Sequence, residues 1–210
     1  MVHIFASIMA SCILVVRNSI RILHDPYKAM REVSREHDVL QIAIILLVSC
    51  GYFLYAAQVR NAGVDALIVA SSAMNASLAF VTTFCLSIGF LYMFGKIFRG
   101  RQNDMLLRII NLTAYSLLPA FMWFTITSTL FVVLPPPRYA TPQGIVFSIV
   151  FVVYSLVLLE LRFMMLYMTI RFALRTSFLD TVKVMAAYLA VFLPYAFVLY
   201  KLGFSRIPYM

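Results

Sequence analysis

Two ionisable residues, Glu160 and Arg162, interrupt a segment that is otherwise apolar from Ile145 to about Ile170. An ionisable group inside such a segment is by default a candidate for a proton or ion relay, or for contact with a substrate. In the alternative, structural role, Arg162 extends to the membrane surface and Glu160 finds a partner on a neighbouring helix. The two residues face different sides of a helix, so they are not expected to pair with each other.

Polar residues of neighbouring segments are the candidate partners of Glu160. Asn111, Tyr115 and Lys183 are the ones that we consider, and Asn75 is a further polar residue in an apolar segment. Such groups commonly form hydrogen bonds between helices, or they line a polar path. We expect them to serve packing and assembly.

No arrangement of residues indicates catalysis. His3, His24 and His37 do not have the spacing of metal ligands, and HExxH, paired CxxC, P-loop and GxSxG motifs are all absent. We therefore expect no enzymatic activity, no catalytic residue, no cofactor and no metal.

The composition identifies the class of protein. The 210 residues are 63% hydrophobic and only 12% charged, whereas soluble domains are roughly 45–50% apolar and about 25% charged. Disorder needs low hydrophobicity, so it is excluded. The three cysteines lie in separate apolar segments, which excludes a disulfide scaffold. The sequence therefore predicts an all-α, polytopic transmembrane bundle.

Five segments have about the 20 apolar residues that a spanning helix needs. They are residues 39–59, 76–95, 114–134, 145–168 and 184–200. A polar turn ending at Gly63 stops the first, and Pro135 to Pro137 stop the third. Asp104 is a predicted N-cap before the third span, Arg108 indicates that residues 105–111 lie at the interface, and Pro119 predicts a kink.

The basic residues alternate along the chain. Counted loop by loop, one side of the membrane holds 12 Lys and Arg residues and the other holds 4. Because basic residues collect in cytoplasmic loops, we expect a cytoplasmic N-terminus and an outside C-terminus. The same rule accounts for the net charge of +9, so we expect no nucleic-acid partner.

Residues 1–38 form an amphipathic region ahead of the five-span domain, residues 39–210. The apolar stretch from Met1 to Val16 has no Lys or Arg, so we do not expect a signal peptide. Polar and apolar residues take opposite sides of a helical wheel, as in a helix lying on the membrane surface, although a sixth span is the alternative. Asp25 and Pro26 predict the start of a second short helix. The candidates for contact with anionic lipid are Arg17, Arg21, Lys28, Arg31 and Arg35.

Three motifs resemble, in order, those of the Yip family of membrane proteins. Residues 25–30, Asp-Pro-Tyr-Lys-Ala-Met, resemble the start of a bacterial Yip domain. Residues 95–100, Gly-Lys-Ile-Phe-Arg-Gly, resemble its small and basic cytoplasmic loop, and residues 114–119, Ala-Tyr-Ser-Leu-Leu-Pro, the opening of its third span. The resemblance covers roughly Ile22 to Phe204. It implies five spans, a cytoplasmic N-terminus, no known catalytic residues and, for compact bacterial members, the plasma (inner) membrane.

Eukaryotic Yip members are linked to Rab GTPases and vesicle traffic, but this chain lacks their long cytoplasmic domain and Asp-Leu-Tyr-Gly-Pro type motif. We expect a non-enzymatic scaffold, assembly or accessory subunit of a membrane protein complex, or a protein of membrane organisation. Its partners would be other membrane proteins and anionic lipids. The alternative is a small transporter or channel component that uses Glu160 and Arg162. It would have a water-filled pocket that reaches Glu160 and is lined by Asn, Ser and Thr.

Overall fold

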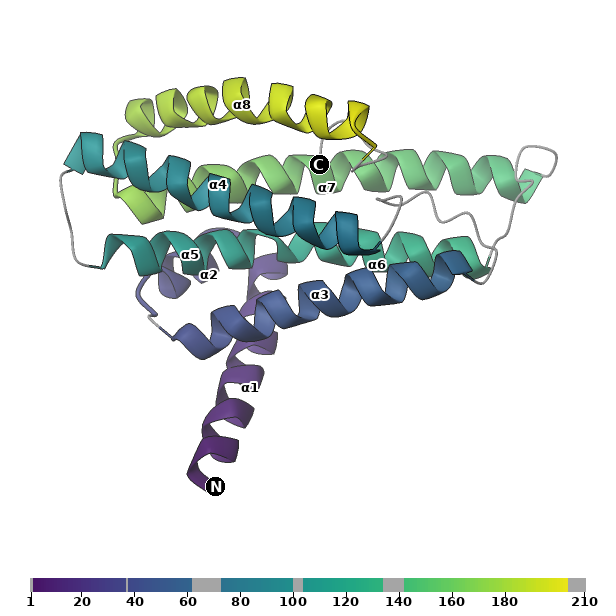
Figure 1. Cartoon of the computed structure of the whole chain (residues 1–210), viewed down its shortest axis with the longest axis horizontal. Helices are drawn as coiled ribbons and strands as arrows, with labels where there is room; N and C mark the ends of the chain where they lie inside the picture. The colour runs from purple at the N-terminus through teal and green to yellow at the C-terminus, as the bar shows by residue number, and fades with distance from the viewer. Residues whose placement is uncertain (1, 37, 62–72, 100–103, 134–141, 204–210) are drawn as a thin grey trace.

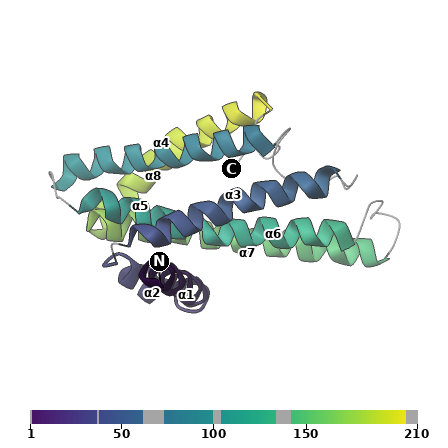
Figure 2. The same ribbon diagram turned by 60° about the horizontal axis from the view of Figure 1, so that its bottom comes forward.

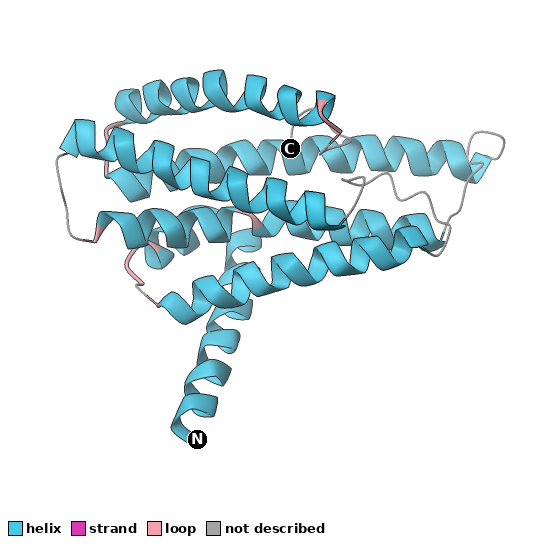
Figure 3. Cartoon of the chain, viewed as in Figure 1, coloured by secondary structure: helices cyan, strands magenta, loops and turns pink. Residues whose placement is uncertain are grey.

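The computed structural model describes residues 2–36, 38–61, 73–99, 104–133 and 142–203. Within these ranges all regular structure is helical (Figure 3), which confirms the all-α prediction. The helices of the described ranges are α1 (Val2–His24), α2 (Pro26–Val33), α3 (Val39–Asn61), α4 (Ala73–Arg99), α5 (Met105–Ser116), α6 (Leu118–Val133), α7 (Pro142–Leu174) and α8 (Phe178–Lys201). The predicted stops at Gly63 and at Pro135 to Pro137 lie outside the described residues.

Five passes run side by side along the long axis of the molecule, and successive passes reverse direction (Figure 1). They are α3, α4, the α5–α6 pair, α7 and α8, which match the five predicted spans in order. Length and apolar composition suffice for crossing a membrane in α1, α4, the α5–α6 pair, α7 and α8, and α3 is apolar over Val39–Tyr55. The protein is therefore an integral membrane helical bundle.

The first helix is arranged differently from the five passes. α1 is long and apolar enough to span a membrane, but it runs across the bundle axis in Figure 1 and is seen nearly end-on in Figure 2. A helix that crosses the other passes in this way does not run parallel to them, as a sixth span would. The geometry favours the predicted surface helix over a sixth span.

Two helix starts have a side-chain capping bond, and the one at Asp25 was predicted. The Asp25 side chain accepts a hydrogen bond from the Lys28 N–H at 3.4 Å, and Pro26 occupies the first helical position of α2. At α8 the Ser177 hydroxyl oxygen accepts from the Asp180 N–H at 3.3 Å. Asp104 precedes α5 without a side-chain capping bond. Local sequence therefore determines where α2 and α8 begin.

The centre of the bundle is α5, which contacts α3, α4 and α7. Nine of its twelve residues are buried. The placement of residues 105–111 at the membrane interface stays a prediction. The packing of α3, α4 and α7 around α5 shows in addition that Arg108 is buried, with only 5% of it exposed.

Close helix packing beside α5 requires the absence of a side chain at Gly95 of α4. A Cβ atom there would lie 2.7 Å from both Leu174 Cδ2 and Met105 Sδ. Helices approach closely where small residues face one another. Gly95 therefore allows α4, α5 and the end of α7 to meet. At the opposite end, Tyr52 of α3 stacks on Phe124 of α6 with ring centroids 5.3 Å apart.

Labelling of single cysteines from each side of the membrane tests this topology. In a cysteine-free background we expect Lys96→Cys and Lys183→Cys to react from the cytoplasmic side and Lys201→Cys from outside, because the end of α4 and the start of α8 lie at one end of the bundle and the end of α8 lies at the other. Ser7→Cys should react from the cytoplasmic side if α1 lies on the surface. Reaction of Ser7→Cys from outside only would make α1 a sixth span.

Candidate functional site

Arg162 turns into the bundle. Its Nη1 donates to the Ser116 carbonyl oxygen at 2.5 Å and to the Ser116 hydroxyl at 3.3 Å. The carbonyl groups at a helix C-terminus lack intrahelical partners and carry the negative end of the helix dipole, so they attract a cation. The prediction that Arg162 extends to the membrane surface is therefore wrong.

The acceptor exists because the third pass is interrupted. α5 ends at Ser116 and α6 begins at Leu118, where the Leu117 N–H donates to the Ala114 carbonyl at 3.1 Å in a tightened turn. Pro119 has no N–H to donate and its ring clashes with the preceding turn. This confirms the predicted effect of Pro119 and places the break directly opposite Arg162.

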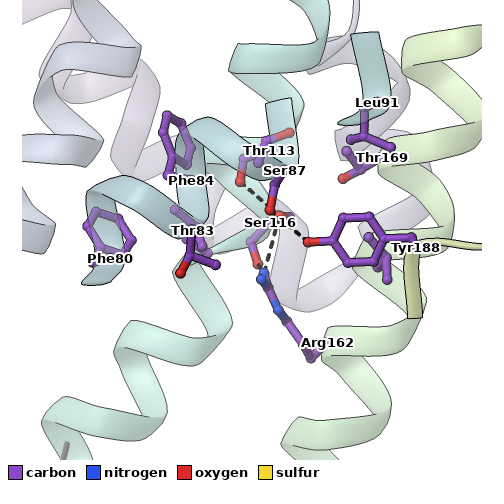
Figure 4. A pocket seen from close by; sticks show the side chains of 12 residues that line it. Phe80, Thr83, Phe84, Ser87, Leu91, Thr113, Ser116, Arg162, Thr169 and Tyr188 are labelled. Atoms are coloured by element: carbon purple, nitrogen blue, oxygen red, sulfur yellow. Dashed lines mark hydrogen bonds between the residues drawn. The ribbon is translucent and has the colours of Figure 1, made fainter. Parts of the chain in front are cut away.

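A cavity of about 60 Å³ lies beside this break (Figure 4). Arg162 lines it together with hydroxyl groups from four passes. These hydroxyl-bearing residues are Thr83 and Ser87 of α4, Thr113 and Ser116 of α5, Thr169 of α7 and Tyr188 of α8. The volume is enough for more than one water molecule, and the remaining wall is aromatic and aliphatic.

The hydroxyl groups at this cavity are only partly used by the protein. Ser87 and Tyr188 share one hydrogen bond of 2.8 Å. The Thr113 hydroxyl oxygen is fully buried, and no residue that the structure describes bonds to it. Buried hydroxyl groups almost always have a partner. One hydroxyl group beside the cavity, that of Thr113, is therefore left unused by the described protein groups.

Glu160 lies on the opposite, outer side of α7, where it is exposed. It is not among the residues that line the cavity. The transport alternative predicted a pocket that reaches Glu160, whereas the pocket in the structure reaches Arg162. The predicted partners of Glu160 are also wrong, because Asn111, Tyr115 and Lys183 bond to α1–α3 residues or to Asp180.

A second polar cluster joins the N-terminal helices to the bundle; we call it the polar junction, formed by Asn18, Glu36, Gln41, Asn111 and Tyr115. Tyr115 donates to Gln41 Oε1 at 2.5 Å. Glu36 Oε2 accepts from Asn18 Nδ2 and from Gln41 Nε2, each at 3.1 Å. Asn111 Nδ2 donates to the Val33 and Glu36 carbonyl oxygens at 3.2 and 3.0 Å. Tyr115 and Asn111 therefore hold α1, α2 and the start of α3 against α5.

The polar side of α1 faces the protein rather than water. Ser11 and Asn18 are buried, and the Ser11 hydroxyl donates to Asp38 Oδ2 at 2.7 Å. Apolar residues on the other side of α1 are exposed, including Phe5, Ile13 and Ile20. A helix whose outer surface is apolar and whose inner surface is polar fits contact with lipid on its outside.

The five predicted lipid-surface residues are all exposed, as that role requires. They are Arg17, Arg21, Lys28, Arg31 and Arg35. Arg17 lies 3.9 Å from Glu36, Arg21 pairs with Glu32, and Lys28 lies 2.9 Å from Asp25. Asn75, in contrast, is half-buried near the start of α4 and belongs to neither the cavity lining nor the polar junction.

Several of these residues carry weak signals in the sequence. The sequence does not distinguish four of the site residues from ordinary polar residues of a span, because single hydroxyl and amide groups are common in apolar spans. They are Gln41, Thr113, Ser116 and Tyr188. Ser116 had one usable signal, since it lies three residues before Pro119. No group of three or more His, Cys, Asp or Glu residues that could hold a metal occurs among the described residues.

Tyr115→Phe tests the polar junction. The substitution removes the donor to Gln41 and leaves a buried acceptor unpaired, so we expect the free energy of unfolding to fall by about 1–3 kcal/mol. Titration with sodium dodecyl sulfate measures it. Tyr55→Phe, which removes an exposed contact to Thr129, is the control and should change little. Equal effects of the two substitutions would contradict the assignment.

Acid should weaken the start of α2. The Lys28 ammonium and backbone N–H bond to the Asp25 carboxylate and lower its pKa below the usual 3.8. A carboxyl group whose pKa is lower in the folded state stabilises that state fully above the ordinary pKa. This stabilisation is lost as the pH falls from the ordinary pKa through the lower, folded-state pKa. Hydrogen exchange of the first α2 turn, corrected for intrinsic rate, should therefore quicken below about pH 4. Asp25→Asn keeps the cap and should abolish this pH dependence; unchanged dependence would contradict the role of the carboxylate.

The comparison with known families agrees with the motifs and with the helical bundle. The model of the Yip1 domain matches residues 20–200. No curated protein and no solved structure matches the chain. The matched range begins within α1 and ends within α8, so it contains the Arg162 cavity and every residue of the polar junction except Asn18. Because the match covers most of the 210 residues, the chain belongs to the Yip1 domain family.

Proposed function

We propose that this Yip1-domain protein is a non-enzymatic accessory subunit that assembles with another membrane protein through the outer face of α7. The observation that supports the proposal is the exposed position of Glu160 on that face. Among the residues that the structure describes, none forms an ion pair or a hydrogen bond with the Glu160 side chain. The absence of any catalytic constellation in the sequence supports the non-enzymatic part.

Glu160 stands in an exposed apolar stripe, which we call the α7 stripe. Its members recur at three- and four-residue spacing, so they share one helix face. They are Val146, Ile149, Val150, Val153, Leu156, Val157, Glu160, Phe163 and Met164. Apart from Glu160 the stripe suits contact with lipid or with another apolar helix equally well.

The depth of Glu160 distinguishes these two surroundings. It lies 11 residues before Arg171, the basic residue in the last turn of α7. At 1.5 Å per residue that is about 16 Å, close to the middle of a hydrocarbon core of roughly 30 Å. A carboxyl group facing lipid tails at this depth is costly. A partner helix that offers a Lys, Arg or amide donor at the same depth removes this cost.

The N-terminal helices would add contact with the membrane surface. We propose that the outer face of α1 and the exposed basic residues of α1 and α2 bind the anionic cytoplasmic leaflet, at about 1 kcal/mol per Lys or Arg near the surface. For the location we propose a bacterial plasma (inner) membrane, by analogy with compact Yip members.

Site-specific crosslinking tests the proposal. A photoreactive residue at Val157, in the full chain at native expression, should capture a defined membrane protein that is recovered in stoichiometric amount. The matched control is Val191 of α8, which is 52% exposed and should capture none. Glu160→Leu should reduce recovery at least about tenfold, because it leaves the partner's donor unpaired in the membrane. Glu160→Gln keeps a side chain that can form hydrogen bonds, so it should retain part of the recovery of the partner.

Two results would contradict the accessory-subunit function. One is recovery of the chain as a bare monomer or homo-oligomer in mild detergent. The other is equal capture from Val157 and Val191 that Glu160→Leu leaves unchanged. Either result would favour the second candidate, a transport function, for which the cavity at Arg162 is the supporting observation.

A further inference from the structure

The charge of Arg162 has no counter-charge among the residues that the structure describes. The ion pairs that Arg17, Arg21, Lys28 and Lys183 form are all with carboxylates outside the cavity, and none of these carboxylates pairs with Arg162. A guanidinium group stays protonated inside proteins. A buried charge without a partner is strongly unfavourable. The Ser116 contacts supply dipoles but no negative charge, so the cavity beside Arg162 has a net positive charge.

The other polar groups at the cavity also offer donors. Thr113 is 6% exposed, and no described residue bonds to its hydroxyl group. In the pair formed by Ser87 and Tyr188, one hydroxyl donates to the other, and the accepting hydroxyl keeps its own hydrogen free. The Arg162 bonds above use only Nη1 of the guanidinium group. Figure 4 shows Arg162, Ser87, Thr113 and Tyr188 together around the cavity.

We propose that this cavity binds a small oxyanion, either a phosphate or a carboxylate group. A guanidinium fork matches both groups geometrically. The Thr113 hydroxyl and the Ser87–Tyr188 pair would donate to oxygens that Arg162 does not reach. The apolar remainder of the wall strengthens the charge interaction, because it excludes water. The inference is independent of the α7 stripe, which lies on the other side of that helix.

The oxyanion can be a free ion or the headgroup of an anionic lipid. The full chain purified in neutral detergent, with chloride as the background anion because it is not an oxyanion, allows the two sources to be compared. The probes are inorganic phosphate, acetate and phosphatidylglycerol. Calorimetry measures binding, and thermal unfolding measures stabilisation. The variants are Arg162→Gln, Thr113→Val and, as a control for lost surface charge, Lys96→Gln.

Phosphate or acetate should bind saturably to the wild type and raise the melting temperature by about 5 °C at 100-fold excess over Kd. Arg162→Gln should weaken binding at least about tenfold and Thr113→Val about fivefold, as expected for a charged and a neutral hydrogen bond. Lys96→Gln should leave Kd unchanged. Thr113→Val also removes an unpaired buried hydroxyl, so without ligand it should melt no lower than the wild type, which separates lost binding from misfolding.

Binding of phosphatidylglycerol but not of the free ions, with the same dependence on Arg162 and Thr113, would support the site and identify a lipid as the source. The inference is overturned if none of the three probes binds saturably. It is equally overturned if binding is as strong in Arg162→Gln and Thr113→Val as in Lys96→Gln.

Discussion

The bundle depends on one contact at its centre, the hydrogen bond from Arg162 to the carbonyl oxygen of Ser116. Proline at 119 removes the N–H that would bond to the Tyr115 carbonyl, and at the resulting helix break the Ser116 carbonyl also lacks its helical donor, the Ala120 N–H. Arg162 of α7 supplies a donor to this carbonyl, and the carbonyl in turn provides a partner for part of the guanidinium group. The contact joins α5 to α7, and the hydroxyl groups of α4 and α8 gather around it.

Polar side chains lie between the helices and apolar side chains lie on the outside, because polar groups away from water need hydrogen-bond partners within the protein. Asn18, Gln41 and Tyr115 hydrogen-bond to one another or to Glu36 between helices, and the apolar residues of α1 and α7 face outward. A membrane offers no hydrogen bonds to exposed polar groups. Glu160 is the exception on the outer surface of α7, and for that reason it carries the proposed function. The two charged residues of α7 therefore have separate roles: Arg162 bonds within the bundle, and Glu160 faces the proposed partner.

Much of the fold was predictable, because hydropathy, basic residues and turn chemistry are local signals. The all-helical class, the helix break at Pro119 and the cap at Asp25 were confirmed in this way. The sites were predictable only as residue types, since the contacts of Arg162, Tyr115 and Asn111 depend on which helices neighbour each other. Arg108 shows the same limit. An arginine near a span end suggests an interface, and only the packing of α3, α4 and α7 around α5 shows that it is buried.

A double-mutant cycle between Pro119 and Arg162 tests the central contact most directly. With Pro119→Ala the helix can continue through Leu117, and the Ser116 carbonyl can bond within it. Arg162→Gln should then cost less stability in the Pro119→Ala background than in the wild type. The account predicts a coupling energy of at least about 1 kcal/mol between the two substitutions. Costs that add to within about 0.3–0.5 kcal/mol would contradict it, because Arg162 would then be independent of the helix break.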